Sequence, residues 1–138
     1  MANINVYLNF NGECEDAFNF YQSVFGGEFA DFNRYADAPP DDRLSADEKD
    51  WIMHVSLPIG GGTFLMGSDS PTAMGAVTPG DNISVSLHTH GDEETDRLYN
   101  ALKEGGQVTM PLEKTFWGAR FGMLVDRFGI PWMVHQDQ

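Results

Sequence analysis

The feature that most constrains this chain is an internal repeat. Asn3-Ile4-Asn5-Val6-Tyr7-Leu8 returns as Asn82-Ile83-Ser84-Val85-Ser86-Leu87, and a helix-like segment ending in Gly26-Gly27 returns with Gly105-Gly106. Ile4 and Ile83 lie 79 residues apart, as do the two glycine pairs, and the matches occur in the same order. Because such self-similarity marks duplicated structural units, we expect two modules of the same construction. They occupy residues 1–68 and 82–138, and residues 69–81 connect them.

Each copy opens with a strand followed by a helix. Apolar and polar residues alternate over residues 3–10, which predicts a strand with one apolar face. Apolar residues at helical spacing follow, and we expect the helix to end at Gly26-Gly27 in the first copy and at Gly105-Gly106 in the second. In the second copy Asp92 is the predicted N-cap. The buried stripes predicted for the two helices are Ala17, Phe18, Tyr21, Val24 and Phe25, and Thr95, Leu98, Tyr99 and Leu102.

Three strand-like runs follow each helix. In the first half they are residues 28–35, 51–57 and 63–66, and in the second half residues 107–116, 119–126 and 130–135. Residues 36–50, with Pro39-Pro40 and several acidic side chains, are predicted to form a solvated loop. Both halves therefore read β-α-β-β-β. The pattern predicts an α+β fold in which two sheets of about four strands pack as one domain, residues 1–138.

The charge balance excludes several classes of function. The chain has 21 acidic and 8 basic residues, a formal net charge of −13, which disfavours binding to nucleic acids and to anionic membranes. The longest uncharged stretch is interrupted by Pro58 and by Gly60-Gly61-Gly62, so no membrane span is expected. The first residues lack a secretory pattern, and the single Cys14 excludes an internal disulfide. We therefore predict a cytoplasmic globular protein.

Four segments suggest a family. They are residues 7–12, residues 17–21 with the following Phe25-Gly26-Gly27, residues 115–122 with Phe116-Trp117-Gly118, and residues 126–134 with Phe128-Gly129-Ile130-Pro131-Trp132. Together they resemble the vicinal oxygen chelate superfamily, which includes glyoxalase I, extradiol dioxygenases and bleomycin-resistance proteins, and within it the PhnB-like group. The resemblance implies tandem βαβββ modules that form a cupped, eight-stranded mixed sheet with flanking helices. It also implies a homodimer, for which unpaired edge strands give a physical reason.

The resemblance also implies where a metal ion would bind. Enzymes of the superfamily hold a divalent ion with His and Glu side chains on the first and last strands of each module. The corresponding positions here are Asn3 or Asn5, Asn82 or Ser84, Met66 and Met133. Amides, a hydroxyl and thioethers hold such an ion poorly, so we predict neither the family metal nor another cofactor.

Polar side chains form a row on each of the two first strands. Leaving a buried polar group unpaired costs about 1–3 kcal/mol, so these rows border either a water- or ligand-filled cup or bulk solvent. The implied superfamily fold favours the cup. The candidate ligand-binding residues are then Asn5, Tyr7, Asn9, His54, Met66, Ser84, Ser86, His88, Trp117, Arg120 and Met133, and no catalytic residue is assigned.

Several candidates have two interpretations. His54 either reaches the cup or is a hydrogen-bonded structural residue. His88 and His90, with Asp92 after them, form either part of a metal site or a polar entry to a loop. Arg120 either holds an anionic ligand or forms an inter-strand ion pair, for instance with Glu113.

The candidate residues and the family resemblance allow two functions. The first is the binding of a small, partly aromatic organic molecule in the cup, without the family metal. The alternative is a metal-dependent isomerase, lyase or dioxygenase whose site is rearranged to use some of His54, His88, Glu113 and His135. Methyl transfer is disfavoured, because Asn11-Gly12-Glu13 is not the glycine-rich turn that follows the first strand of a parallel methyltransferase sheet.

Overall fold

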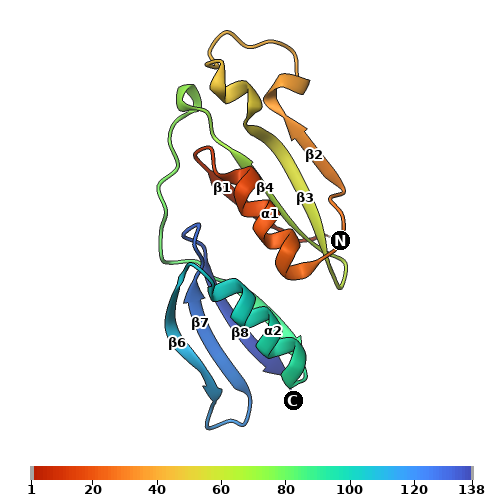
Figure 1. Ribbon diagram of the computed structural model, residues 1–138, viewed down its shortest axis with the longest axis vertical. Coiled ribbons are helices and arrows are strands. Elements are labelled where there is room, and N and C mark those ends of the chain that lie inside the picture. The colour runs from red at the N-terminus through yellow and green to blue at the C-terminus, as the bar shows by residue number, and fades with distance from the viewer. Residues whose placement is uncertain (1, 138) are drawn as a thin grey trace. The chain divides into compact units, whose positions relative to one another are not determined.

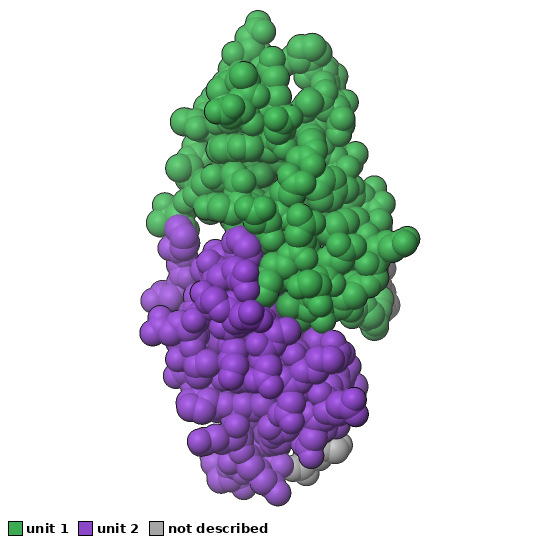
Figure 2. Space-filling view, viewed as in Figure 1, with its two compact units in different colours: residues 1–78 green, residues 79–138 purple. Residues whose placement is uncertain are grey.

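The sequence repeat is a structural repeat. The computed structural model describes residues 2–137 and divides into two compact units, Met1–Thr78 and Pro79–Gln138, called here the first and second modules (Figure 2). Each module is a mixed four-stranded sheet with one helix (Figure 1). The predicted α+β fold of tandem βαβββ modules is confirmed, and the boundary between the modules lies inside the predicted connector.

The two modules have the same topology. The elements of the first are β1 (Val6–Phe10), α1 (Cys14–Phe25), β2 (Asp31–Arg34), β3 (Ile52–Gly60) and β4 (Thr63–Asp69). Those of the second are β5 (Val85–His90), α2 (Asp92–Lys103), β6 (Gln107–Lys114), β7 (Arg120–Val125) and β8 (Pro131–Asp137). The strand orders are β1-β4-β3-β2 and β5-β8-β7-β6. The first and last strands of each module pair in parallel, and the other pairs are antiparallel.

Each helix covers one face of its own sheet, as the apolar stripes predict. Ala17, Phe18, Tyr21 and Val24 of α1 are buried, as are Thr95, Leu98, Tyr99 and Leu102 of α2. A glycine of the sheet lies beneath an aromatic ring of each helix. A Cβ on Gly67 would stand 2.6 Å from the Phe18 ring, and one on Gly122 would stand 2.9 Å from the Tyr99 ring. The opposite side of each sheet, called here the helix-free face, therefore carries the remaining side chains of the strands.

Several local predictions were wrong. Phe25, predicted on the buried stripe of α1, is only half-buried. The N-cap of α2 is Gly91 rather than Asp92, which is the first helical residue. Strand β4 continues to Asp69, because its parallel pairing with β1 extends to Phe10 opposite Asp69, whose carboxylate is buried among backbone N–H donors. The loop 36–50 is not solvated throughout: it contains the 3₁₀ turns Tyr35–Asp37 and Asp47–Asp50, and Glu48 is buried.

Glu48 is buried because it joins two segments of the first module. Its Oε1 accepts a hydrogen bond from the backbone N–H of Ser45 at 2.9 Å, and its Oε2 accepts one from Thr72 at 2.8 Å. These bonds, the one from Ser45 first, lower the pKa of the Glu48 carboxyl to about 2.

No helix in the described part of the chain, residues 2–137, combines the length and the apolar character that crossing a membrane requires. The cytoplasmic location expected from the sequence stays a prediction.

Candidate functional site

The predicted polar rows lie on the helix-free faces. In the first module Tyr7 stands directly opposite Met66, and Asn9 opposite Ser68. In the second module Ser86 stands opposite Met133, and His88 opposite His135. Asn5 and Ser84 come immediately before β1 and β5 and thus lie outside the sheet ladders. The candidate residues on the strands therefore fall into two sets, one on each module.

The side chains around the family's metal positions do not fit a divalent ion. Thioethers, which are soft ligands, occupy the last-strand positions Met66 and Met133, where the superfamily has carboxylates. The residues opposite them, Tyr7 and Ser86, offer neutral hydroxyls. A hard or borderline ion such as Mn²⁺ or Zn²⁺ requires carboxylate or imidazole ligands that these positions lack.

In the first module the candidate pair is Tyr7 and His54. The Tyr7 hydroxyl lies 3.3 Å from Nδ1 of His54, and the two rings are stacked with their centroids 5.8 Å apart. Tyr7 is exposed and His54 is half-buried, so the pair presents a hydroxyl, an imidazole and two ring edges on the helix-free face. His54 is thus hydrogen-bonded and also accessible to a ligand.

In the second module a row of rings runs across the helix-free face. Its members are Trp117, Phe121, His135 and His88, and we call them the ring row. Successive centroids are 6.5, 6.3 and 5.1 Å apart. The row follows from the strand register, because Phe121 pairs with His135 and His135 with His88. Trp117 joins it from the β6–β7 hairpin, where it is 54% exposed.

Asp137 joins the two histidines of the ring row, and sequence reasoning missed it. Its Oδ1 lies 3.3 Å from Nδ1 of His88 and 3.1 Å from Nδ1 of His135. These contacts, that with His88 first, lower the pKa of the Asp137 carboxyl. Strand β8 extends to this residue, whereas the predicted strand ended at His135. Alternation along the strand, which puts residues two apart on the same face, is the signal that could have found it.

Of the three residues of the predicted rearranged metal site that belong to the second module, the structure brings His88 and His135 together. His54 belongs to the first module, where its partner is Tyr7. Glu113 stands opposite Phe121 at the far edge of the second sheet, and Phe121 separates it from His135. The third acidic or imidazole group beside the two histidines is Asp137.

Arg120 lies on the helix side of the sheet. Its guanidinium pairs with Asp96 at 2.7 Å and Asp92 at 3.1 Å on α2, and it donates to Oε1 of Gln136 at 3.1 Å. Ion pairing is thus the interpretation that the geometry favours, with the carboxylates of α2 as partners in place of Glu113. The hydrogen bond with Asp96, more than that with Asp92, raises the pKa of Arg120.

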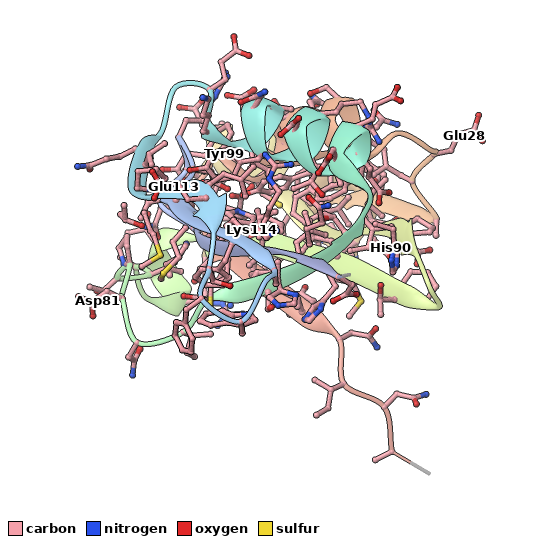
Figure 3. All side chains as sticks on the ribbon, turned by 90° about the horizontal axis from the view of Figure 1, so that it is seen from below. Glu28, Asp81, His90, Tyr99, Glu113 and Lys114 are labelled. Carbon is pink, nitrogen blue, oxygen red and sulfur yellow. The ribbon has the colours of Figure 1, made fainter. Side chains whose placement is uncertain are left out.

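A polar pocket of about 380 Å³ lies in the second module, a volume that suits a small ligand. Its charged lining consists of Asp92, Glu113, Lys114, Arg120 and Asp137; Glu113 and Lys114 end strand β6 (Figure 3). The Arg120 charge is already balanced by α2. Asp137 belongs both to this pocket and to the contact with the two histidines, whereas Asp92, Arg120 and Gln136 place most of the lining on the helix side of the sheet.

Comparison with known families gives a match over nearly the whole chain. Residues 2–135 match the family described as 3-demethylubiquinone-9 3-methyltransferase.

Three solved structures resemble this one. The protein PA1353 from Pseudomonas aeruginosa is 43% identical over 100% of this chain and 99% of its own, with a TM-score of 0.88. A PhnB protein from Bacillus cereus is 26% identical over 99% of this chain and 100% of its own, with a TM-score of 0.77. A glyoxalase/bleomycin resistance protein/dioxygenase family enzyme from Burkholderia phytofirmans is 17% identical over 94% and 95% of the two chains, with a TM-score of 0.61. This last likeness concerns the fold alone.

Proposed function

The chain belongs to the PhnB-like family of the vicinal oxygen chelate superfamily, and from this premise we propose that it binds a small, ring-containing organic molecule without a metal ion at the family's positions. The observation that carries the proposal is the ring row on the helix-free face of the second module. Asp137, which contacts the two histidines of the row, also lines the polar pocket.

The ring row has the properties of a surface for stacking. Trp117 and Phe121 present apolar ring surface, and aromatic contacts of this kind contribute about 0.5–1.5 kcal/mol beyond the area they bury. His88 and His135 add hydrogen-bonding nitrogens at the other end of the row. A planar molecule can therefore stack on the tryptophan end and hydrogen-bond at the histidine end.

The charge around the ring row selects among such molecules. Asp137 and Glu113 lie beside it, the whole chain carries a formal charge of −13, and the Arg120 cation is neutralised by two carboxylates. The ligand is therefore neutral or cationic. A ring that bears an ammonium group gains from the nearby carboxylates, and a ring that bears a carboxylate is repelled.

In the first module Tyr7 and His54 offer a second surface on which a ring-containing ligand can bind. Their stacked rings, hydroxyl and imidazole lie beside Met66, and Asn9 and Asn5 extend the polar row along the strand and before it. We assign these residues to ligand binding by the first module, and Ser84, Ser86, Met133 and the ring row to binding by the second. No residue is assigned to catalysis.

Replacing Trp117 with alanine should weaken the binding of benzylamine, a cationic ring probe, about two- to tenfold, because one aromatic stacking partner is lost. Ligand-observed NMR measures the affinity, because it does not require the fluorophore that the substitution removes. Trp117→Phe, which keeps a ring, should recover part of it. Benzoate, the anionic counterpart of the probe, should bind more weakly than benzylamine to the unmodified chain.

Met74→Ala is the matched control for this experiment. Met74 is 49% exposed, close to the 54% of Trp117, and lies in the first module in a 3₁₀ turn. It should leave the affinity for benzylamine unchanged. Equal affinities of Trp117→Ala and the unmodified chain would refute the proposal, as would the absence of binding by every neutral and cationic ring compound in a fragment library.

We also propose that the chain forms a homodimer. Strand β6 is an edge strand of its sheet, almost all of it is exposed, and it presents Val108 and Met110 to solvent. Such an edge invites pairing with another strand. Light scattering coupled to size exclusion should give about twice the 15.3 kDa chain mass. The mass of a single chain at micromolar concentration would contradict this proposal.

The methyltransferase in the family's description is not the activity that we propose. Both sheets are mixed, and the parallel pair β1–β4 is flanked by an antiparallel strand. The turn after β1 contains Asn11 and Gly12, and its N–H groups are occupied by Glu13 and Asp69 carboxylates. These features do not support a cofactor-binding turn of the methyltransferase kind.

A further inference from the structure

We propose that His88, His135 and Asp137 form a binding site for a divalent transition-metal ion on the helix-free face of the second module. Among residues 2–137 these three are the group whose imidazole and carboxylate ligand atoms converge, all within 4.8 Å of one another. The site does not depend on the organic ligand proposed above.

The strand pairing creates this convergence. His88 of β5 and His135 of β8 stand directly opposite each other in the parallel pair, with their ring centroids 5.1 Å apart. Asp137 is two residues beyond His135, and residues two apart on a strand project from the same face. Three ligands on two hydrogen-bonded strands are thus held by the sheet itself.

The distances agree with those around a bound ion. Oδ1 of Asp137 lies 3.3 Å from Nδ1 of His88 and 3.1 Å from Nδ1 of His135. Ligand atoms bound at about 2.0–2.2 Å in tetrahedral or octahedral geometry lie about 3.0–3.5 Å apart. The ligand atoms of the two histidines lie within 4.8 Å of each other, so an ion can replace the two hydrogen bonds once the imidazoles close on it.

The ligand set indicates the class of metal. Two imidazoles and one carboxylate suit Zn²⁺, Co²⁺, Ni²⁺ or Fe²⁺ better than Mg²⁺ or Ca²⁺, which prefer oxygen ligands alone. The side chain of His88 is 59% exposed and that of Asp137 is 39% exposed, so water or a substrate atom can occupy the remaining coordination positions. Asp137 also lines the polar pocket.

The site differs from the one that the superfamily uses. Met133 occupies the family's position on the last strand, and His135 lies two residues further, about 6.6 Å along β8. The ion is thus displaced toward the end of the strand and held by the second module alone.

Titration with Co²⁺ and Zn²⁺ tests this inference. The full chain is purified without a polyhistidine tag and titrated by absorption spectroscopy for Co²⁺ and by calorimetry for Zn²⁺, with no organic ligand present. One equivalent should bind to each chain. Asp137→Asn and His88→Ala should each weaken binding at least about tenfold, because the loss of a ligand costs no less than the loss of a supporting residue.

Asp81→Asn is the matched control for Asp137→Asn. It makes the same chemical change at Asp81, an exposed residue before β5 that is not one of the three ligands (Figure 3). Its metal affinity should equal that of the unmodified chain, and circular dichroism should show that all variants are folded. No uptake of either ion, or equal affinities in His88→Ala, Asp137→Asn and the unmodified chain, would overturn the inference. Neither result would bear on benzylamine binding, which is measured without metal.

Discussion

Replacing Asp69 with alanine should lower the free energy of unfolding by about 3–5 kcal/mol, because three backbone N–H groups lose their acceptor at once. Oδ1 of Asp69 accepts from Gly12 at 2.8 Å and from Cys14 at 3.0 Å, and Oδ2 accepts from Ile52 at 2.9 Å. The carboxylate therefore joins the end of β4 to the beginnings of α1 and β3. Urea denaturation followed by circular dichroism measures the change.

Asp81→Ala is the control for Asp69→Ala. It removes the same carboxylate from an exposed position and should change the free energy of unfolding by no more than about 0.5 kcal/mol. The loss of unfolding free energy in Asp69→Asn should lie between those of Asp69→Ala and Asp81→Ala. The amide keeps one oxygen acceptor, but its NH₂ group faces a backbone N–H donor. A loss below about 1 kcal/mol in Asp69→Ala would show that water replaces the carboxylate, contrary to our expectation.

Trp132→Ala should destabilise the second module by about 3–5 kcal/mol, the usual cost of removing a large core aromatic side chain. Trp132 is 1% exposed and is the largest fully buried side chain of the described chain. Its indole Nε1 donates to Oδ2 of Asp126 at 2.9 Å, while Oδ1 of Asp126 accepts from the backbone of Phe128 and Ile130. The substitution thus empties part of the core and removes a donor from a buried carboxylate.

Two further variants separate packing from hydrogen bonding at this position. Trp132→Phe keeps a ring and loses the indole N–H, so it should cost less than Trp132→Ala. Trp117→Ala removes the same side chain from an exposed position and should cost less than about 1 kcal/mol. If the two alanine variants had the same denaturation midpoint, the assignment of Trp132 to the core would be wrong.

The elements of this fold could be predicted because their signals are local. The spacing of Thr95, Leu98, Tyr99 and Leu102 reports a helix face directly, and all four are buried. The repeat then required both halves to have the same order of elements. Patterns of this kind depend on residues within one or two helical turns of each other. They can therefore be recognised in the sequence without knowing which distant residues come into contact.

Asp69 shows where local signals fail. The sequence predicts that it begins the connector, because nothing in its vicinity reveals that the N–H groups of Gly12, Cys14 and Ile52 meet there. Similarly, the sequence leaves Arg120 open between an anionic ligand and an inter-strand ion pair, and does not reveal its partners, Asp92 and Asp96 of α2. In both cases the partners are far away in the sequence.

The amino-acid sequence by itself determined the duplicated β-α-β-β-β order, the apolar faces of the helices and the neutral residues at the family's metal positions. Only the tertiary structure decided that His88, His135 and Asp137 meet and that Trp117 continues the row through Phe121. The physical reason is the register between strands. Hydrogen bonding between β5, β7 and β8 sets which side chains lie opposite one another. The composition and the periodicity of the sequence do not determine that register.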